Sequence, residues 1–149
     1  MTILVRDLMR KNPYTVAESA SIQDTARIMN EKKVSSLVIL DKDNNPVGLV
    51  TERDLVRKVC VNDLPTSRVS NKEIMSSPLI TIASESSVST ATDLMLKNNV
   101  RHLLVIENES KYSNQPIGII TPLDLVRIEE YTRDEGRKDA LEMILEYYI

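Results

Sequence analysis

Apolar and polar positions follow the same order twice along this chain. A short apolar leader precedes a proline, Pro13 or Pro78, and a short extended segment follows that proline. A stretch with helical spacing comes next, and two runs of branched aliphatic residues complete the series. Internal repeats place equivalent residues at a fixed offset, and Met9 and Met75 are 66 positions apart. The pattern therefore indicates a duplicated unit.

Each repeat contains one amphipathic helix with a recognisable beginning. Ser is a favoured N-cap residue, and Ser21, with Asp24 three residues later, and Ser87 occupy that place in the two repeats. Apolar residues at intervals of three or four then share one face of the helix. The predicted faces consist of Ile22, Ala26 and Met29 in the first helix and of Val88, Ala91, Thr92 and Met95 in the second.

The two aliphatic runs after each helix predict strands that are joined as hairpins. Beyond the first run the offset between repeats grows from 66 to 70, and the extra residues lie in the polar stretch 107–115. Insertions are tolerated in surface turns, so we expect a longer hairpin loop there. A second helix is predicted to begin after Thr51 and after Thr121. The runs cover residues 34–40 and 47–50 in the first repeat and 100–106 and 117–120 in the second.

The predicted unit is thus strand, helix, strand, strand, helix, which places the fold in the α/β (α+β) class. Between the repeats we expect residues 57–61 to prolong a helix and residues 65–67 to turn. The predicted divisions are repeat 1 at 5–60, a linker at 61–69, repeat 2 at 70–130 and a C-terminal helical tail at 131–149. The tail and the residues just before it would carry a broken apolar stripe of Ile128, Tyr131, Leu141, Ile144, Leu145 and Tyr148.

Composition narrows the function classes. A length of 149 residues suits one domain or two small units that share a core. The chain has no Phe and no Trp, so its core must be aliphatic and filled by Met. A net charge of −3 argues against a nucleic-acid binder, which usually carries a basic surface. No apolar run approaches a membrane span, and no signal peptide is evident. We therefore expect a cytoplasmic protein without membrane contact.

Reactive residues are few. His102 is the single histidine, and no cysteine or histidine stands near it, which argues against a metal site. Cys60 is the single cysteine and is predicted to be a buried apolar residue. The sequence contains neither a recognisable Ser–His–Asp set nor a glycine-rich phosphate loop. We therefore predict no catalytic residues, no cofactor and no enzymatic activity.

The two repeats share one polar motif. Gly-x-x-Thr-x-x-Asp occurs at 48–54 and again at 118–124, at the end of an aliphatic run in both cases. Thr followed by Asp three residues later is also a variant capping box, so the motif can simply begin a helix. Alternatively, the hydroxyl and the carboxylate can hold a ribose phosphate. One copy would favour capping, whereas two copies at matching places favour a ligand site, and a capping Thr can still face a ligand.

With this motif in both repeats, and with Val-Arg-His-Leu-Leu-Val at 100–105, the chain resembles a tandem pair of cystathionine-β-synthase (CBS) domains. The resemblance covers roughly residues 5–60 and 70–130. It implies two pseudo-symmetric β-α-β-β-α repeats packed through their sheets, with clefts that bind adenine nucleotides or S-adenosylmethionine. It also implies a regulatory sensor that forms a homodimer.

The resemblance and the chemistry of a nucleotide together suggest the contacts. Asp54 and Asp124 would accept hydrogen bonds from the ribose cis-diol, and Thr51 and Thr121 would hold phosphate or the ribose–phosphate bridge. Arg53 stands inside the first motif where the second has Leu123, which suggests unequal phosphate preference. The base would lie in an apolar slot of Val16, Ile82, Val34 and Val100, and Arg53, Arg101 and His102 are the cations available for phosphate.

The leading hypothesis is a regulatory module that binds AMP, ADP or ATP and signals to a partner protein by a conformational shift. A sensor of S-adenosylmethionine is one alternative. Another is a ligand-free scaffold that dimerises or docks a partner protein through its apolar helices and tail.

Overall fold

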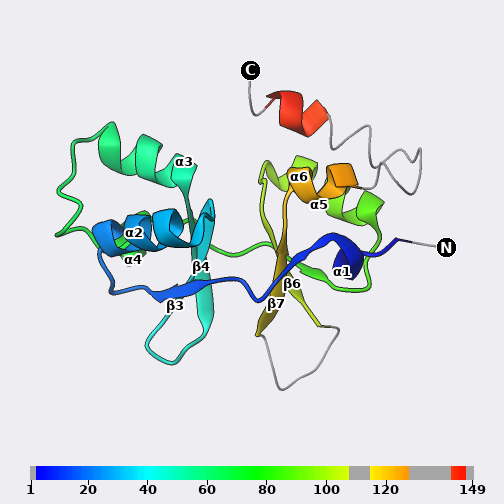
Figure 1. Ribbon diagram of the computed structural model, residues 1–149, viewed down its shortest axis with the longest axis horizontal. Coiled ribbons are helices and arrows are strands. Elements are labelled where there is room, and N and C mark those ends of the chain that lie inside the picture. Colours follow the sequence, from blue (N-terminus) through cyan, green and yellow to red (C-terminus); the bar gives the residue numbers. More distant parts are fainter. Residues whose placement is uncertain (1–2, 108–114, 128–141, 147–149) are drawn as a thin grey trace. The chain divides into compact units, whose positions relative to one another are not determined.

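The computed structural model describes residues 3–107, 115–127 and 142–146. The chain forms two compact units, which Figure 1 shows with the chain coloured along its length. One is Pro13–Leu79, here called the middle unit. The other joins Met1–Asn12 to Ile80–Ile149 and is called the terminal unit. Each unit has its own sheet and its own apolar core.

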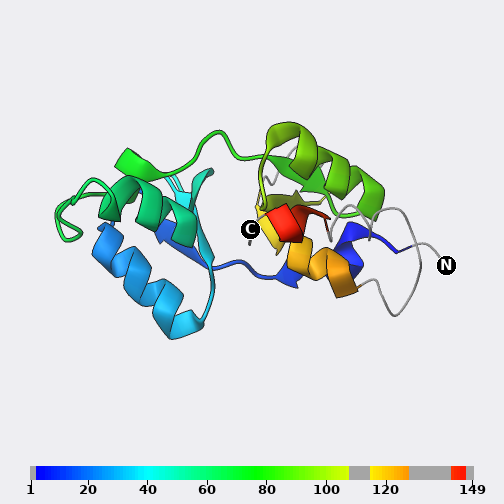
Figure 2. The ribbon, with the colours of Figure 1, turned by 90° about the horizontal axis from the view of Figure 1, so that it is seen from above.

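The sheet of the middle unit has the strand order β2-β3-β4, with β2 parallel to β3 and β4 antiparallel to β3. Figures 1 and 2 show α2 and the helix formed by α3 and η1 on one face of this sheet. The π-helix η1 continues α3, which confirms the prediction that the helix is prolonged. The elements are β2 (Thr15–Ala17), α2 (Ile22–Lys32), β3 (Ser36–Leu40), β4 (Pro46–Thr51), α3 (Glu52–Asp54), η1 (Leu55–Cys60) and α4 (Asn71–Ile74).

The sheet of the terminal unit has the order β1-β7-β6-β5. Strand β5 runs parallel to β6, while β7 is antiparallel to both β6 and β1. This sheet repeats the middle one and adds a strand from the N-terminal leader. The elements are α1 (Val5–Leu8), β1 (Arg10–Lys11), β5 (Thr81–Ala83), α5 (Val88–Asn98), β6 (Leu103–Ile106), β7 (Pro116–Ile120) and α6 (Pro122–Val126).

The two hairpins match in register, as expected of a duplicated unit. Leu37 pairs with Val50 in the first, and Leu103 pairs with Ile120 at the equivalent place in the second. Each hairpin also has one register irregularity near its turn, after Ile39 in one and after Val105 in the other. The predicted α+β class and the predicted hairpins are therefore confirmed. Residues 108–114, which make up most of the predicted longer loop, lie outside the described part.

The long helices begin at the predicted caps. The Ser21 hydroxyl accepts a hydrogen bond from the Asp24 N–H at 3.1 Å, and α5 begins in the same way at Ser87. The predicted face of α5 is buried throughout. In α2 the fully buried residues are Ile22, Thr25 and Met29, and Ala26 of the predicted face is half-buried. Thr25 is buried because its hydroxyl donates to the Asn71 side chain at 2.6 Å, which fastens α4 to α2.

The leaders are exchanged between the repeats. Strand β1, from the first repeat, pairs with β7 of the second. The second leader, α4, lies in the middle unit, where Ser76 forms a bridge with Leu49 of β4. The compact units therefore do not coincide with the sequence repeats, because each hairpin is completed by the leader of the other repeat.

The region between the repeats turns as predicted: the N–H groups of Arg68 and Val69 both donate to the Pro65 carbonyl. In the tail, the described helix at 142–146 buries Met143 in the core of the terminal unit. The predicted tail stripe was wrong on this point, because Leu145 is exposed. Its members Ile128, Tyr131, Leu141 and Tyr148 lie outside the described residues. Among the helices that are described, none is long and apolar enough to cross a membrane.

Candidate functional site

The two Gly-x-x-Thr-x-x-Asp motifs form capping boxes at the ends of matching strands. The Thr51 N–H and hydroxyl both donate to Asp54 Oδ2, at 2.9 and 3.2 Å. In the terminal unit the Thr121 N–H and hydroxyl donate to Asp124 Oδ2, at 2.9 and 3.1 Å. Each cap therefore orients the carboxylate through Oδ2 and leaves Oδ1 for other contacts.

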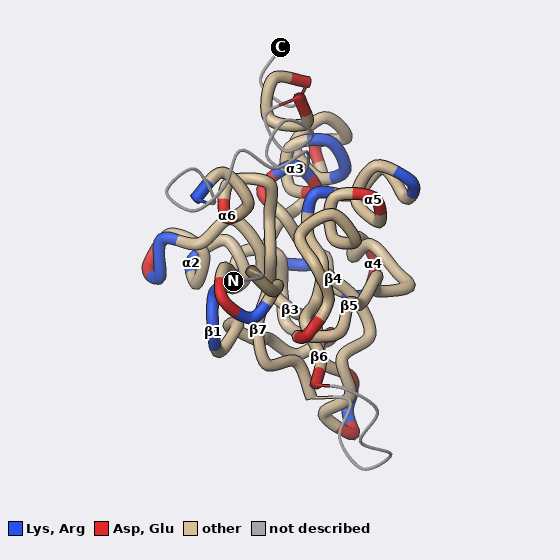
Figure 3. Tube along the Cα trace, turned by 90° about the vertical axis from the view of Figure 1, so that its right-hand side faces the viewer, with Lys and Arg blue, Asp and Glu red and all other residues tan. Residues whose placement is uncertain are grey.

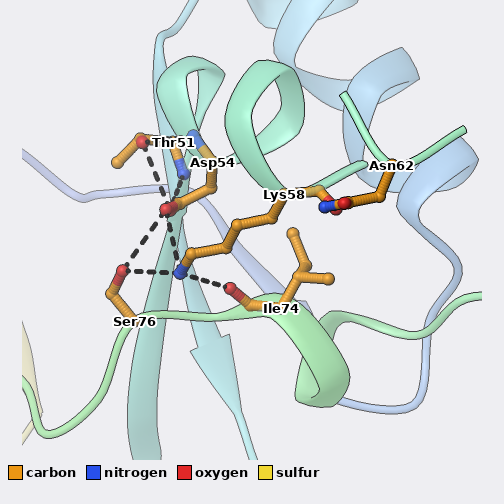
Figure 4. A network of polar contacts seen from close by, with 6 residues as sticks. All are labelled: Thr51, Asp54, Lys58, Asn62, Ile74 and Ser76. Carbon is orange, nitrogen blue, oxygen red and sulfur yellow. Dashed lines mark hydrogen bonds and ion pairs between the residues drawn. The ribbon is translucent and has the colours of Figure 1, made fainter. Parts of the chain in front are cut away.

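Asp54 Oδ1 lies in a polar network, which Figure 4 shows. Lys58 Nζ is 3.2 Å from this oxygen and also donates to the Ile74 carbonyl at 2.8 Å. The Ser76 hydroxyl lies 3.4 Å from the same carboxylate oxygen. The Asp54 side chain is 11% exposed, so solvent still reaches it. The network joins η1 to the segment that contains α4.

Asp124 Oδ1 has different surroundings. Arg10 Nε lies 3.7 Å from it and a terminal nitrogen of Arg127 lies 3.8 Å away, which are ion-pair distances but too long for hydrogen bonds. The Asp124 side chain is 0% exposed. Among the residues that the structure describes, none forms a hydrogen bond with Oδ1. Two cations thus compensate the charge while the acceptor itself stays unsatisfied.

Both hydroxyls of the motif are engaged by the caps. The Thr51 hydroxyl donates to Asp54 and accepts a hydrogen bond from the Asp54 N–H, and the Thr121 hydroxyl donates to Asp124. Because phosphate oxygens require donors, the predicted contact of either Thr with phosphate would have to replace its bond to the aspartate. The side chains best placed to meet a phosphate are therefore the cations near each Oδ1.

Several of the other predicted site residues lie at the same ends of the two sheets. Val16 and Ile82 do not, because they pair with Ile39 and Val105 near the hairpin turns, toward the opposite ends. Val34 precedes β3, whose first residue pairs with Thr51, and Val100–His102 precede β6, which pairs with the end of β7. Ile82 is only 4% exposed and belongs to the core of the terminal unit. The remaining predicted side chains are half-buried, namely Val16, Val34, Val100, Arg53, Arg101 and His102.

The motif glycines allow each leader to pass close to the hairpin. A Cβ added to Gly48 would lie 2.5 Å from Met75 Sδ and 3.1 Å from the Ser76 carbonyl oxygen. At Gly118 the added Cβ would collide with Met9 Sδ and would lie 2.9 Å from the Arg10 carbonyl oxygen. At both glycines it is therefore the leader of the other repeat that comes close to the strand. The space beside each glycine is filled by a methionine, consistent with the role of the repeated methionines as core filler.

Sequence reasoning missed four residues beside the two carboxylates. Arg10 and Ser76 each follow the leader methionine and are separated by the same 66 positions, so the repeat offset could have revealed them as equivalents. Arg127 stands three residues after Asp124 and Lys58 stands four after Asp54, which places both on the helix that follows the motif. Each leader and each motif helix thus contributes one polar partner.

Two further features lie away from these ends. A hollow of about 540 Å³ in the terminal unit is bordered by Arg6, Lys11, Ser84 and Glu107, beside the beginning of β7 rather than its end. Cys60 is exposed. The prediction of a buried Cys60 was wrong, because η1 turns this last residue away from the core side that Val59 occupies.

Comparison with known proteins places the fold. An uncharacterised protein of Methanopyrus kandleri is 31% identical over 87% of this chain, and the match covers 64% of the length of that protein. A solved structure of an uncharacterised conserved protein from Pyrococcus horikoshii is 30% identical with a TM-score of 0.76, and covers 91% of this chain and 97% of its own. The structure of a hexameric CBS-CP12 protein from bloom-forming cyanobacteria is 26% identical with a TM-score of 0.78, and covers 98% and 80%.

The family model that describes the CBS domain matches this chain twice, at residues 5–60 and 72–131. Each match contains one Gly-x-x-Thr-x-x-Asp motif and one hairpin. Little of the chain lies outside the two matches. The chain therefore belongs to the CBS-domain family and carries the domain as a tandem pair.

Proposed function

We propose that this CBS pair is a regulatory module that binds an adenine nucleotide, AMP, ADP or ATP, at its Asp54 and Asp124 ends and signals to a partner protein. One observation carries the proposal. At both ends a capping box holds Oδ2 of the aspartate and leaves Oδ1 beside cationic side chains.

This arrangement suits a phosphorylated sugar. Ribose hydroxyls are hydrogen-bond donors, and an oriented carboxylate oxygen accepts them well because no rotamer freedom remains to be lost. Because the cap occupies Oδ2, only Oδ1 of each aspartate is left to accept hydrogen bonds from the ribose hydroxyls. Phosphate, in turn, requires cations, which Lys58 supplies at one end and Arg10 and Arg127 supply at the other.

The same contacts offer a route for the signal. Lys58 binds Asp54 Oδ1 and the Ile74 carbonyl at once, so it links η1 to α4. A ligand that donates a hydrogen bond to Asp54 Oδ1 competes with Lys58 for this oxygen, while the contact of Lys58 with the Ile74 carbonyl can remain. It therefore favours arrangements in which Lys58 is released or turned toward phosphate, and the extent of the shift is set by the difference in ligand affinity between the arrangements.

Calorimetric titration with AMP, ADP, ATP and S-adenosylmethionine tests the proposal. We expect a phosphorylated ligand to bind, and we expect Asp54→Asn and Asp124→Asn each to weaken the binding. Asn retains an oxygen for the cap, so these variants remove the charge with little change in fold. A protein that binds none of the four ligands at millimolar concentration would refute the proposal.

A ligand-free scaffold is the second candidate, favoured by exposed apolar side chains. Val56, Leu123 and Leu145 are each more than half exposed, on η1, on α6 and in the tail helix. The similar cyanobacterial CBS-CP12 protein is hexameric. Light scattering should then give a mass above that of one chain, and Val56→Glu or Leu123→Glu should lower it. A monomeric wild type would exclude a scaffold built on self-association.

A further inference from the structure

Asp124 Oδ1 is a buried acceptor without a hydrogen bond in the described part of the chain, and it distinguishes the two ends. The equivalent oxygen of Asp54 has Lys58 at 3.2 Å and Ser76 at 3.4 Å. A buried, charged oxygen without a donor is costly to keep, and proteins rarely keep one without a reason. The unsatisfied position at Asp124 is therefore suited to a donor that arrives with a ligand.

The cations around Asp124 exceed what its charge requires. Among the residues that the structure describes, one carboxylate pairs here with two guanidinium groups, which leaves one positive charge in excess. The side chains of Arg10 and Arg127 are 48% and 62% exposed, so both can turn toward a second partner. Guanidinium groups present planar pairs of donors that match phosphate. The excess positive charge of Arg10 and Arg127 therefore favours the binding of an anion.

Arg10 reaches this place because the leaders are exchanged. It lies on β1, which Figure 3 shows as a basic segment beside β7, and its partner in the register is Ile119. The residue at the same point of the other leader is Ser76, a neutral side chain. The two ends therefore differ in charge for a reason that lies outside the motif.

We infer that Arg10 and Arg127 make the Asp124 end selective for phosphorylated sugars. This inference rests on the proposed nucleotide function and adds its ligand class. Phosphate draws the guanidinium groups away from Asp124, and a ribose hydroxyl then donates to the uncovered Oδ1. A nucleoside without phosphate offers the arginines no counter-charge. S-adenosylmethionine carries a sulfonium cation, which the excess positive charge repels.

The test measures the ratio of affinities at one end. In the full-length Asp54→Asn protein, in which binding at the other end is weakened, calorimetry compares AMP with adenosine, S-adenosylmethionine and ribose 5-phosphate. AMP should bind most tightly. Arg10→Ser, which copies the residue of the other leader, should weaken AMP binding about tenfold, as expected for the loss of one charge-assisted contact, and should change adenosine binding little.

Two further variants guard against misfolding. Arg10→Lys keeps the charge without the fork and should lose less AMP affinity than Arg10→Ser. Arg127→Ser alters a largely exposed side chain and should lower the ratio of AMP to adenosine affinity in a folded protein. If Arg10 only neutralises Asp124 for stability, Arg10→Ser will lower the melting temperature while this ratio stays unchanged, and an unchanged ratio in Arg10→Ser and Arg127→Ser overturns the inference.

The base-free ligand separates the two proposals. If ribose 5-phosphate binds in an Arg10-dependent manner and AMP binds no better, the adenine proposal fails while the selectivity of the Asp124 end stands. If AMP binds and the arginine variants leave the ratio unchanged, the selectivity fails alone. If nothing binds, both fail.

Discussion

The Asp54 and Asp124 ends share a motif and differ in what surrounds it. In both, the Thr N–H at the start of a helix donates to Oδ2 of the aspartate three residues later. At Asp54 the second oxygen contacts Lys58 and Ser76 at 3.2 and 3.4 Å. At Asp124 it faces two guanidinium groups at 3.7 and 3.8 Å. Identical motif residues therefore hold two different electrostatic environments.

The source of this difference is the exchange of leaders. Arg10 and Ser76 occupy equivalent places, and each contacts the aspartate of the other repeat. That Arg53 and Leu123 give the two motifs unequal phosphate preference stays a prediction. The difference between Arg10 and Ser76 is a second reason to expect such a preference. A duplicated binding motif can thus diverge through a segment that is distant in sequence.

The largest expected effect is the loss of stability when Gly48 or Gly118, which the leaders approach closely, is replaced by Ala. Gly118→Ala should lower the free energy of unfolding by about 3 kcal/mol and Gly48→Ala by about 2, since overpacking a fixed contact is costly. Gly118 is the more sensitive because its added Cβ would meet the Arg10 backbone at 2.9 Å, against 3.1 Å for Ser76 at the other end. Denaturant unfolding measures both.

The double variant Met9→Ala/Gly118→Ala serves as the control for this comparison. Removing the methionine side chain relieves one of the two collisions at Gly118 and leaves the backbone collision in place. The pair should therefore be less unstable than the sum of its single changes. Additive losses would show that Met9 does not determine the need for glycine.

Features that depend on near neighbours in the sequence could be predicted, and those that depend on distant contacts could not. The duplication, the hairpins, both helix caps and the capping function of Thr51 and Thr121 all follow from local patterns, because capping and strand alternation depend on near neighbours. The exchange of leaders depends on contacts between distant segments, so it is not written in any local pattern. Arg10 was missed for that reason, although the repeat offset pointed to it as the equivalent of Ser76. Lys58 stands only four residues after Asp54, so its spacing was a local signal that went unused.

Other departures have local causes. Cys60 was expected inside because a free cysteine usually behaves as a small apolar residue, but it is the last residue of η1 and lies exposed beside the buried Val59. Thr25 is buried beside the predicted face because Asn71 supplies a partner for its hydroxyl. Neither the sequence motif nor the geometry around the two aspartates identifies a ligand, so nucleotide binding stays a prediction.

The second-largest expected effect is the loss of stability when the cation beside each aspartate is removed. Arg10→Met should cost about 2 kcal/mol of stability and Lys58→Met about 1, because losing the partner of a buried charge costs more than losing a partly exposed one. Asp124 is 0% exposed, whereas Asp54 is 11% exposed and can be hydrated. Unfolding in urea at low and high salt measures both losses. A larger loss for Lys58→Met would reverse the comparison.

A smaller effect comes from the capping hydroxyls. Thr51→Val should cost about 1 kcal/mol and Thr121→Val about 0.5, within the range for N-cap hydroxyls. The Thr51 hydroxyl both donates to Asp54 and accepts from its N–H, whereas Asp124 N–H donates to the Thr121 carbonyl. Thr51→Ser and Thr121→Ser keep the hydroxyl and serve as matched controls. Equal losses at the two ends would show that the caps are equivalent in energy.

The smallest effect belongs to the turn of the first hairpin. Asp41 Oδ1 accepts hydrogen bonds from the N–H groups of Asn45 and Asp43, both at 2.9 Å. The backbone hydrogen bond from Asn45, followed by that from Asp43, holds the pKa of Asp41 below its ordinary value of 3.8. A carboxyl with a lowered pKa in the folded state stabilises the fold above pH 3.8, and this contribution is lost as the pH falls through the lowered value.

Asp41→Ala should therefore melt at a lower temperature than the wild type at pH 7, and the gap should narrow in acid. Asp41→Asn keeps an acceptor oxygen for the two N–H groups, so its stability relative to Asp41→Ala should stay constant with pH. NMR titration of the Asp41 carboxyl carbon gives the pKa directly. A value at or above 3.8, or a gap that does not narrow in acid, would mean that this turn is held by its backbone alone.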